Sequence, residues 1–289
     1  MTTSCCPGWV RFAEMEYPEN LSHLSSCKSP HQMFGAIIKS YYAEKNNIDP
    51  KNIYVVSVMP CIAKKFERQR EEMKVNGLWD VDSVITTREL ARMIKQANIE
   101  FDKLEDETFD SPMGEATGAA AIFGVTGGVM EAALRTAYEL ITGEELEKLE
   151  FEEIRGAKGI KKATLQIGDK EVKVAVAHGL SNARKIMEEI KNGTSDYQFV
   201  EVMACPGGCI MGGGQPIKSS KVRMTVDVAA KRAEAMYSID ERSVIRKSHE
   251  NPILKQIYKE YIGKPGEHKA HELLHTHYMK REMNFEDIS

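Results

Sequence analysis

Hydrophobic and polar positions follow a helical period in four stretches of the chain. Apolar residues recur at helical spacing, and each stretch predicts a helix, at residues 8–17, 30–46, 86–99 and 181–192. The second stretch starts near Pro30, which the first turn of a helix tolerates. The third opens with a threonine followed by Glu89, the arrangement of a capping box.

Other stretches have the composition of strands. The β-branched runs at 53–60 and 197–205 predict two buried strands. Residues 163–180 predict a hairpin with Gly168–Asp169 in its turn. Residues 119–143 predict a strand, a glycine turn and then a helix. The acidic stretch 100–115 is expected to be a loop.

Strands that alternate with helices indicate an α/β fold. We expect two lobes with mixed, partly parallel sheets flanked by helices, and an active site between the lobes. The expected division is a first lobe at 1–115, a second lobe at 116–225 and a helical C-terminal region at 226–289. Two prolines, Pro252 and Pro265, interrupt the last region.

Composition restricts the classes of function. The 289 residues are 42% hydrophobic and 28% charged, which is typical of a soluble globular protein. A net charge of -4 does not favour nucleic acid or an anionic membrane surface as a partner. No apolar run approaches the ~20 residues of a membrane span, and the first residues do not form a secretory signal. We therefore predict a cytoplasmic protein without nucleic-acid or membrane partners.

Candidate chemistry is concentrated in cysteines that follow the predicted strands. Cys61 follows one strand, Cys205 ends the other, and Cys209 lies four residues later. Ligands of α/β sheets gather at the carboxyl ends of strands. With Cys6, the chain offers four thiolates, enough for a 4Fe–4S cluster.

Two alternatives stay open at this point. Four cysteines also suit a structural zinc ion, although zinc sites usually combine two close cysteine pairs and only one such pair is present. The cysteines could also be small buried hydrophobic residues. Glycines at 207–214 favour a cluster, because they let backbone N–H groups approach inorganic sulfide.

Three motifs, TSCCPGW, MPCIAKKFE and VMACPGGCIMGGGQP, occur in this order. Together with GVTGGVMEAALR and GKPGEHKAHELLHTHY, they resemble the signature sequences of the iron-only (FeFe) hydrogenases over nearly the whole chain. The resemblance implies an H-cluster, in which a 4Fe–4S cluster is joined to a two-iron subcluster with CO, cyanide and a bridging dithiolate. It implies that the metal ligands are Cys6, Cys61, Cys205 and Cys209.

The resemblance also implies roles for side chains around the cluster. Cys5 corresponds to the proton-relay thiol, Ser25 to a relay hydroxyl, and Lys64 to the donor that hydrogen-bonds a cyanide ligand. An ammonium is a strong donor to an anionic ligand. Residues that correspond to the walls of the two-iron subcluster are His31, Met59, Pro60, Phe123, Gly124 and Met203.

Several of these positions have simpler interpretations. Ser25 could be a loop or capping residue, and the apolar wall residues could belong to an ordinary core. Cys27 matches no cluster ligand and is interpreted as a structural thiol. His31 departs from the family, which often has glutamine there, and its charge can change near neutral pH.

The resemblance implies reversible H2 oxidation and proton reduction, with ferredoxin or an NAD(P)-linked subunit as electron partner and maturation proteins to build the cluster. It also implies that part of the first lobe lies upstream of Met1, so that the first lobe is incomplete and the isolated chain inactive. Two other functions stay open: a hydrogenase-like iron–sulfur assembly protein that holds only a 4Fe–4S cluster, and a hydrogen-sensing domain. Cys5 argues against the first, because assembly proteins of this kind generally lack its equivalent.

Overall fold

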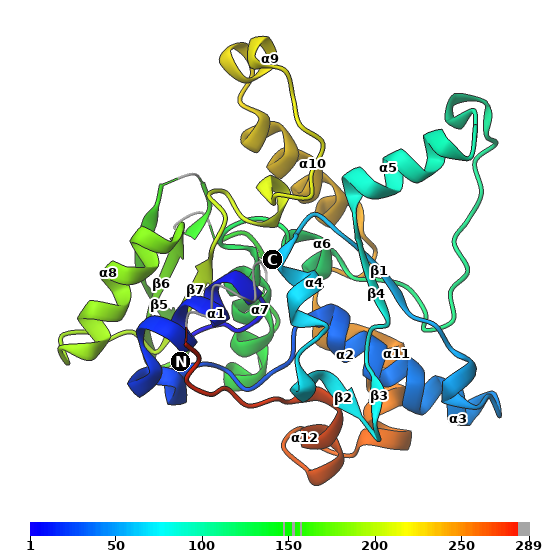
Figure 1. The fold of residues 1–289 in the computed structure, drawn as a ribbon. Helices are drawn as coiled ribbons and strands as arrows, with labels where there is room; N and C mark the ends of the chain where they lie inside the picture. Colours follow the sequence, from blue (N-terminus) through cyan, green and yellow to red (C-terminus); the bar gives the residue numbers. More distant parts are fainter. Residues whose placement is uncertain (147, 152–153, 157, 283–289) are drawn as a thin grey trace.

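The computed structural model describes residues 1–146, 148–151, 154–156 and 158–282, and it has the mixed α/β fold that the sequence predicts (Figure 1). Its helices are α1 (Pro7–Glu16), α2 (Pro30–Ile37), α3 (Ala43–Lys45), α4 (Ala63–Glu67), α5 (Thr87–Gln96), α6 (Gly118–Ile122), α7 (Gly128–Thr142), α8 (Leu180–Lys191), α9 (Ser220–Thr225), α10 (Val228–Arg242), α11 (Pro252–Ile257) and α12 (His268–Leu274). Its strands are β1 (Val56–Met59), β2 (Lys74–Val75), β3 (Leu78–Trp79), β4 (Ser83–Thr86), β5 (Ile160–Ile167), β6 (Lys170–His178) and β7 (Phe199–Met203).

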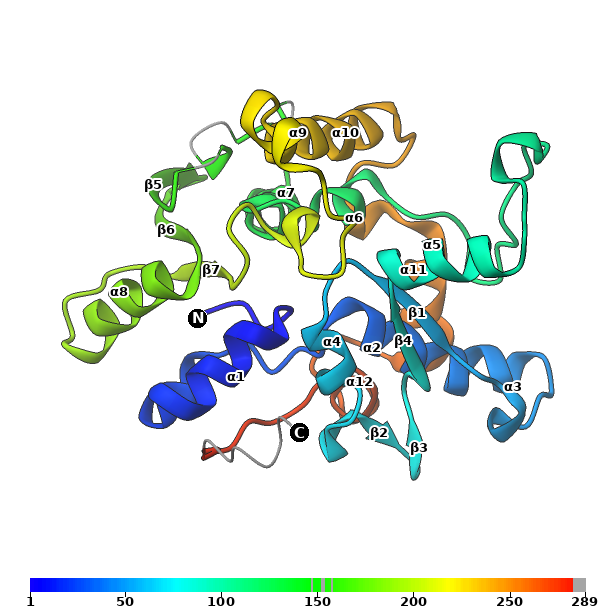
Figure 2. The ribbon, with the colours of Figure 1, turned by 45° about the horizontal axis from the view of Figure 1, so that its top comes forward.

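The larger sheet has the order β5-β6-β7. Strands β5 and β6 form an antiparallel hairpin in which Ile167 pairs with Lys170, which confirms the predicted turn at Gly168. Strand β7 pairs with β6 in parallel, and α8 is the crossover between them. In Figures 1 and 2 this sheet and α8 lie on one side of the molecule, and β1 and β4 lie on the other.

The first residues of the chain pack with the larger sheet. Thr2 forms bridges to both Leu24 and Val200, and its neighbour Thr3 donates to the Val200 carbonyl at 2.9 Å. Trp9 on α1 is fully buried in the core that includes β6, β7 and α8. Residues 1–24 therefore share a core with the sheet at 160–203, while the division of the chain at residues 115 and 225 stays a prediction.

The smaller sheet pairs β1 with β4 in parallel. The sequence analysis did not predict β4. It did predict a strand within residues 53–60, where β1 lies, but the prediction that this strand is buried is wrong. Val56 is 49% exposed and Val58 is 43% exposed, because nothing in the described part of the chain covers that face of β1. Helix α5, which follows β4, begins with the predicted capping box: the Thr86 side chain accepts from the Glu89 N–H, and Glu89 accepts from the Thr86 N–H.

The predicted strand at the start of 119–143 is wrong. Residues from Gly118 to Ile122 form α6, capped by Thr117, whose Oγ1 accepts from the Ala120 N–H at 3.3 Å. Three consecutive alanines favour a helix over a strand. The glycine turn is confirmed: Gly127 has a φ of +91°, and a Cβ there would lie 2.3 Å from the Ile154 carbonyl oxygen.

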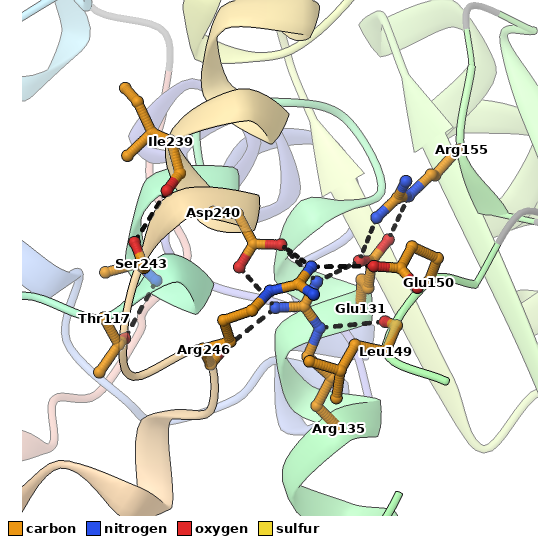
Figure 3. Close-up of polar contacts among 11 residues, drawn as sticks. Thr117, Glu131, Arg135, Leu149, Glu150, Arg155, Ile239, Asp240, Ser243 and Arg246 are labelled. Carbon is orange, nitrogen blue, oxygen red and sulfur yellow. Dashed lines mark hydrogen bonds and ion pairs between the residues drawn. The ribbon is translucent and has the colours of Figure 1, made fainter. Parts of the chain in front are cut away.

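A buried ionic network joins α7 to α10 (Figure 3). The Arg135 guanidinium donates to both oxygens of Asp240, each at 2.8 Å, and to Glu131 at 2.6 Å. Arg155 donates to both oxygens of Glu131, and Arg246 donates to Asp240 at 2.6 Å and to Glu150 at 2.9 Å. Since all three arginines have carboxylate partners, the network balances its own charge in the interior.

The C-terminal region is mainly helical, as predicted, and Pro252 begins α11 instead of ending a helix. After α12 the chain returns to α1. There the Tyr278 hydroxyl donates to the Ser25 carbonyl at 2.7 Å, and Arg281 pairs with Glu14 at 3.2 Å. Among the described helices, none has the length and apolar character required to cross a membrane.

Candidate metal centre

A cavity lined by five cysteines lies where several elements end. The lining residues are Cys5, Cys6, Pro7, Cys61, Lys64, Met203, Ala204, Cys205, Gly208, Cys209 and Gly212. The structure therefore brings together the four predicted metal ligands, the predicted relay thiol and the predicted cyanide donor. They come from positions up to 204 residues apart in the chain.

The ends of secondary-structure elements place the four ligand cysteines. Cys6 precedes α1 with an extended backbone. Cys61 is the second residue after β1, and Cys205 is the second residue after β7. Cys209 begins a short 3-10 turn after Gly208, whose φ is +95°. The strand ends are the position that the sequence indicated for a site.

Backbone contacts hold the cysteine-bearing loops together. The Gly214 N–H donates to the Pro60 carbonyl at 2.8 Å, which links the loop after Cys209 to the loop before Cys61. A Cβ on Gly212 would lie 2.2 Å from the same carbonyl oxygen. The loops approach so closely that one of them must lack a side chain at this point.

Burial makes the thiols poor acids in the absence of a cation. Burial raises the pKa of Cys209 to about 12, and the neighbouring Cys6 adds to the shift. Burial likewise raises the pKa of Cys61 and Cys205, and it raises the pKa of Cys5 well above its usual range. A bound metal must therefore displace protons, and its positive charge is what would stabilise the thiolates.

The sulfur spacing favours a cluster over a single ion. In a tetrahedral zinc site with Zn–S bonds of about 2.3 Å, the sulfurs lie roughly 4 Å apart. Among the residues that the structure describes, the group with three ligand atoms within 4.8 Å of one another is Glu139, His249 and Glu250, and no three cysteines form such a group. Four thiols around one cavity at wider spacing fit an iron–sulfur cage.

The Glu139 group has a simpler explanation than a metal. The Lys247 ammonium already lies 2.5 Å from Glu139 and 3.3 Å from Glu250, and His249 donates to or accepts from Glu139 at 2.7 Å. A lysine in this position supplies the positive charge that an ion would supply.

Lys64 reaches the cavity from α4. Its ammonium donates to the Cys5 carbonyl at 3.3 Å and to Glu67 Oε2 at 3.1 Å. Burial, the largest single influence, would lower the pKa of Lys64, but the negative charges of Glu67, Cys5 and Cys209 together outweigh it and raise that pKa. The ammonium is therefore retained at the edge of the cavity despite its burial.

His31 does not line this cavity. Its Nδ1 lies 2.9 Å from the Ser57 hydroxyl, and its Nε2 lies 2.5 Å from Glu67 Oε2. Burial lowers the pKa of His31, and the bond to Glu67 opposes that shift only in part. The ring is therefore mainly neutral near pH 7, and it donates Nε2–H to the carboxylate.

The other predicted wall residues lie in different surroundings. Met203 is buried and lines the cavity, and Phe123 packs against the core cluster that contains Cys6 and Met203. Pro60 and Gly124 contribute carbonyls that accept from the Cys209 loop, and Met59 pairs with Thr86 in the smaller sheet. Ser25 accepts from the Cys27 N–H at 3.3 Å. Their predicted roles toward a cofactor stay predictions.

Sequence reasoning missed Glu67, although it belongs to the quoted motif MPCIAKKFE. A lysine and a glutamate three residues apart on a helix are usually a surface pair. Only the packing of α2 against α4 shows that this pair is buried.

The chain matches two family models. Residues 1–213 match the family described as the iron only hydrogenase large subunit, C-terminal domain, and residues 226–281 match the iron hydrogenase small subunit. The α/β fold and the thiol-lined cavity fit an iron–sulfur protein. The chain belongs to the iron-only hydrogenase family.

Relatives and solved structures agree. The chain is 54% identical to the NADP-reducing hydrogenase subunit HndD of Solidesulfovibrio fructosivorans and 53% identical to iron hydrogenase 1 of Clostridium pasteurianum, over 97% of this chain in both comparisons. It spans 47% and 49% of those proteins, about half their length. A structure of the [FeFe]-hydrogenase HydA(deltaEFG) matches with a TM-score of 0.83 and 42% identity, over 98% of this chain and 77% of the other.

More distant relatives are not named as hydrogenases. Protein NAR1 of Arabidopsis thaliana is 35% identical over 96% of this chain and 60% of its own length, and a cytosolic Fe-S cluster assembly factor of Danio rerio is 32% identical. The family relationship implies iron–sulfur clusters and the H-cluster, but these relatives leave the choice between catalysis and assembly to experiment.

Proposed function

We propose that this chain carries the catalytic H-cluster site of an iron-only hydrogenase, which interconverts H2 with protons and electrons. The observation that carries the proposal is the cavity that joins Cys6, Cys61, Cys205 and Cys209 to a fifth thiol and an ammonium. An assembly protein that held only a cubane would need the four thiols alone.

The bound H-cluster would supply a redox-active metal site at which H2 is split heterolytically. The chain's own residues have three tasks. The four cysteines would hold the 4Fe–4S part, and Cys209 would also hold the two-iron part. Lys64 presents an ammonium to an anionic ligand. Cys5, half-buried at the cavity wall, holds and passes a proton at Sγ.

Further residues and partners belong to the same proposal. Ser25 continues the proton route from Cys5, and His31, Met59, Pro60, Phe123, Gly124 and Met203 surround the two-iron subcluster with its CO, cyanide and dithiolate ligands. The electron partner is ferredoxin or an NAD(P)-linked subunit, maturation proteins install the subcluster, and the compartment is the cytoplasm. The name of the HndD relative supports an NAD(P)-linked partner.

Reconstitution tests the iron–sulfur part of the proposal. The chain loaded with iron and sulfide should hold about four iron atoms per chain, as a 4Fe–4S cluster requires. Cys61→Ser should lose most of that iron, since one of the four ligands is removed. Cys27→Ser is the matched control, because Cys27 lies outside the cavity lining, and it should keep the iron content of the wild type.

Infrared spectroscopy separates a hydrogenase from an assembly protein. After treatment with a two-iron precursor, the proposed function requires bands of iron-bound CO and cyanide. A cubane without those bands would favour the assembly protein. H2 production from a reduced dye would exclude a hydrogen-sensing domain, whereas bands without turnover would favour either that domain or a catalytic site whose first lobe is incomplete.

A further inference from the structure

Three hydrogen-bond donors converge on a single carboxylate oxygen beside the cysteine-lined cavity. Glu67 Oε2 lies 2.8 Å from Ser29 Oγ, 2.5 Å from His31 Nε2 and 3.1 Å from Lys64 Nζ. Ser29 and His31 flank the start of α2, and the other two residues lie on α4. All four residues are buried, so bulk water does not compete for these donors.

The position of the Lys64 ammonium depends on this carboxylate. An ammonium carries three protons, and Glu67 and the Cys5 carbonyl accept two of them. Lys64 also lines the cavity, together with Cys5 and Cys209. The third proton is therefore available to an acceptor inside the cavity. A flexible four-carbon side chain would adopt many rotamers without a fixed partner.

We propose that Glu67 is a positioning residue of the proposed H-cluster site, which holds the Lys64 ammonium against the Cys5 carbonyl with one N–H directed into the cavity. Glu67 touches neither the cavity nor its contents, and it acts only through Lys64. The identity of the group that Lys64 contacts in the cavity rests on the proposed function. The pairing of Lys64 with Glu67 does not depend on it.

His31 and Ser29 complete this arrangement by fixing the carboxylate. Because both ring nitrogens of His31 have partners, the imidazole links Ser57 on β1 to Glu67 on α4. The carboxylate is thereby anchored from α2 and cannot follow the lysine if the lysine side chain moves. Lys65 and Glu89 form the matching pair on the surface, at 2.6 Å but with both side chains more than one-third exposed.

Nuclear magnetic resonance of the cluster-free full-length chain tests the pairing. With 15N-labelled lysine, the buried Lys64 ammonium should give a signal protected from solvent exchange. Glu67→Met, which removes the acceptor, should abolish that protection, and Glu67→Asp, which keeps the charge, should restore part of it. The Lys28 ammonium, buried against Asp80 at 2.7 Å, should keep its signal in every variant. Unchanged protection of Lys64 in Glu67→Met would overturn the proposal.

Infrared spectra of the loaded protein test what the pairing does. In Glu67→Met the cyanide bands should shift in the same direction as in Lys64→Met, while Glu89→Met should leave them unchanged. The double variant Lys64→Met/Glu67→Met should show the bands of Lys64→Met alone, because Glu67 has no other route to the cluster. Additive shifts in the double variant would contradict the proposal.

The two experiments distinguish failure of this inference from failure of the proposed function. A wild-type protein without cyanide bands would refute the two-iron cofactor, and the ammonium signal would still decide the pairing. If Glu67→Met does not fold, because Lys64 is left buried without its counter-charge, the double variant removes both charges. The proposal then requires the double variant to fold and to give the Lys64→Met spectrum, and a double variant that also fails to fold would overturn it.

Discussion

Glu201 on β7 is a buried carboxylate whose partners are backbone groups. Its two oxygens accept from the Gly127 N–H at 2.6 Å and from the Met130 N–H at 2.7 Å, at the start of α7. Burial raises the pKa of Glu201 to about 7, although those two N–H groups oppose the shift. The side chain therefore joins the larger sheet to α7 at the cost of a pH-sensitive group in the interior.

Glu201 should make the folding stability of the cluster-free chain depend on pH. A carboxyl group with a folded-state pKa of about 7 and an unfolded value near 4.5 favours folding in full below pH 4.5, and this contribution is lost as the pH rises through 7. The loss is on the order of 3 kcal/mol. Urea unfolding of the wild type and of Glu201→Gln between pH 4 and 8 measures this loss of stability. The difference between the two free energies of unfolding should change over that pH range. A constant difference would mean that Glu201 keeps an ordinary pKa.

Gly212 should tolerate substitution far less than its neighbour Gly213. A Cβ at Gly212 meets the backbone oxygen of Pro60 at 2.2 Å, whereas a Cβ at Gly213 meets the end of the Ile62 side chain at 3.0 Å. Backbone cannot move aside as a side chain can, so Gly212→Ala should cost about 1–3 kcal/mol. Gly213→Ala should cost less, and it is the control. Denaturant titration measures both, and equal costs would show that the two loops can separate.

At the scale of elements, helices α7 and α10 depend on the ionic network of Figure 3. Asp240→Asn keeps the shape of the side chain but leaves the buried Arg135 without a full counter-charge, so we expect a loss of about 3 kcal/mol. Glu234→Gln on the same helix breaks an exposed pair with Lys231 and should change stability by less than ~1 kcal/mol. Thermal unfolding of the two variants would compare them directly. Similar values would mean that the network contributes shape without net charge stabilisation.

The elements were predictable where local chemistry decides. The capping box at Thr86 and the hairpin turn at Gly168 follow from residues that lie within four positions of each other. The strand expected near residue 119 was wrong because the helix propensity of its alanines outweighs its hydrophobicity. Strand β4 was missed because four residues give too short a pattern.

Some residues of the candidate site could be predicted from the sequence, and others could not. The cysteines could be found because their chemistry is rare and strand ends attract sites. The contacts of Glu67 could not, because they depend on how α2 packs against α4, and no local pattern specifies that distance. The exposure of Val56 could not be found either, because burial depends on what covers a strand.

At the scale of the whole molecule, one face of the smaller sheet is open. Parallel strands are normally covered on both faces, and here Val56 and Val58 lie exposed. The isolated chain should therefore associate at high concentration. Replacing both valines by threonine should weaken the association, whereas Val244→Thr, at a fully exposed position elsewhere, should not. Sedimentation velocity over a concentration series would detect this, and a wild-type chain that stays monomeric would show that the face needs no cover.

The four proposed cysteine ligands lie far apart along the polypeptide, and this has a mechanical consequence. A metal cage bound to Cys6, Cys61, Cys205 and Cys209 would tie about 200 residues into closed loops. If the two ends of a loaded molecule were pulled, the tied segments could not lengthen until iron–sulfur bonds broke. Rupture would then release roughly 70 nm of hidden contour length, at about 3.5 Å per residue. A chain stripped of iron should extend without that step.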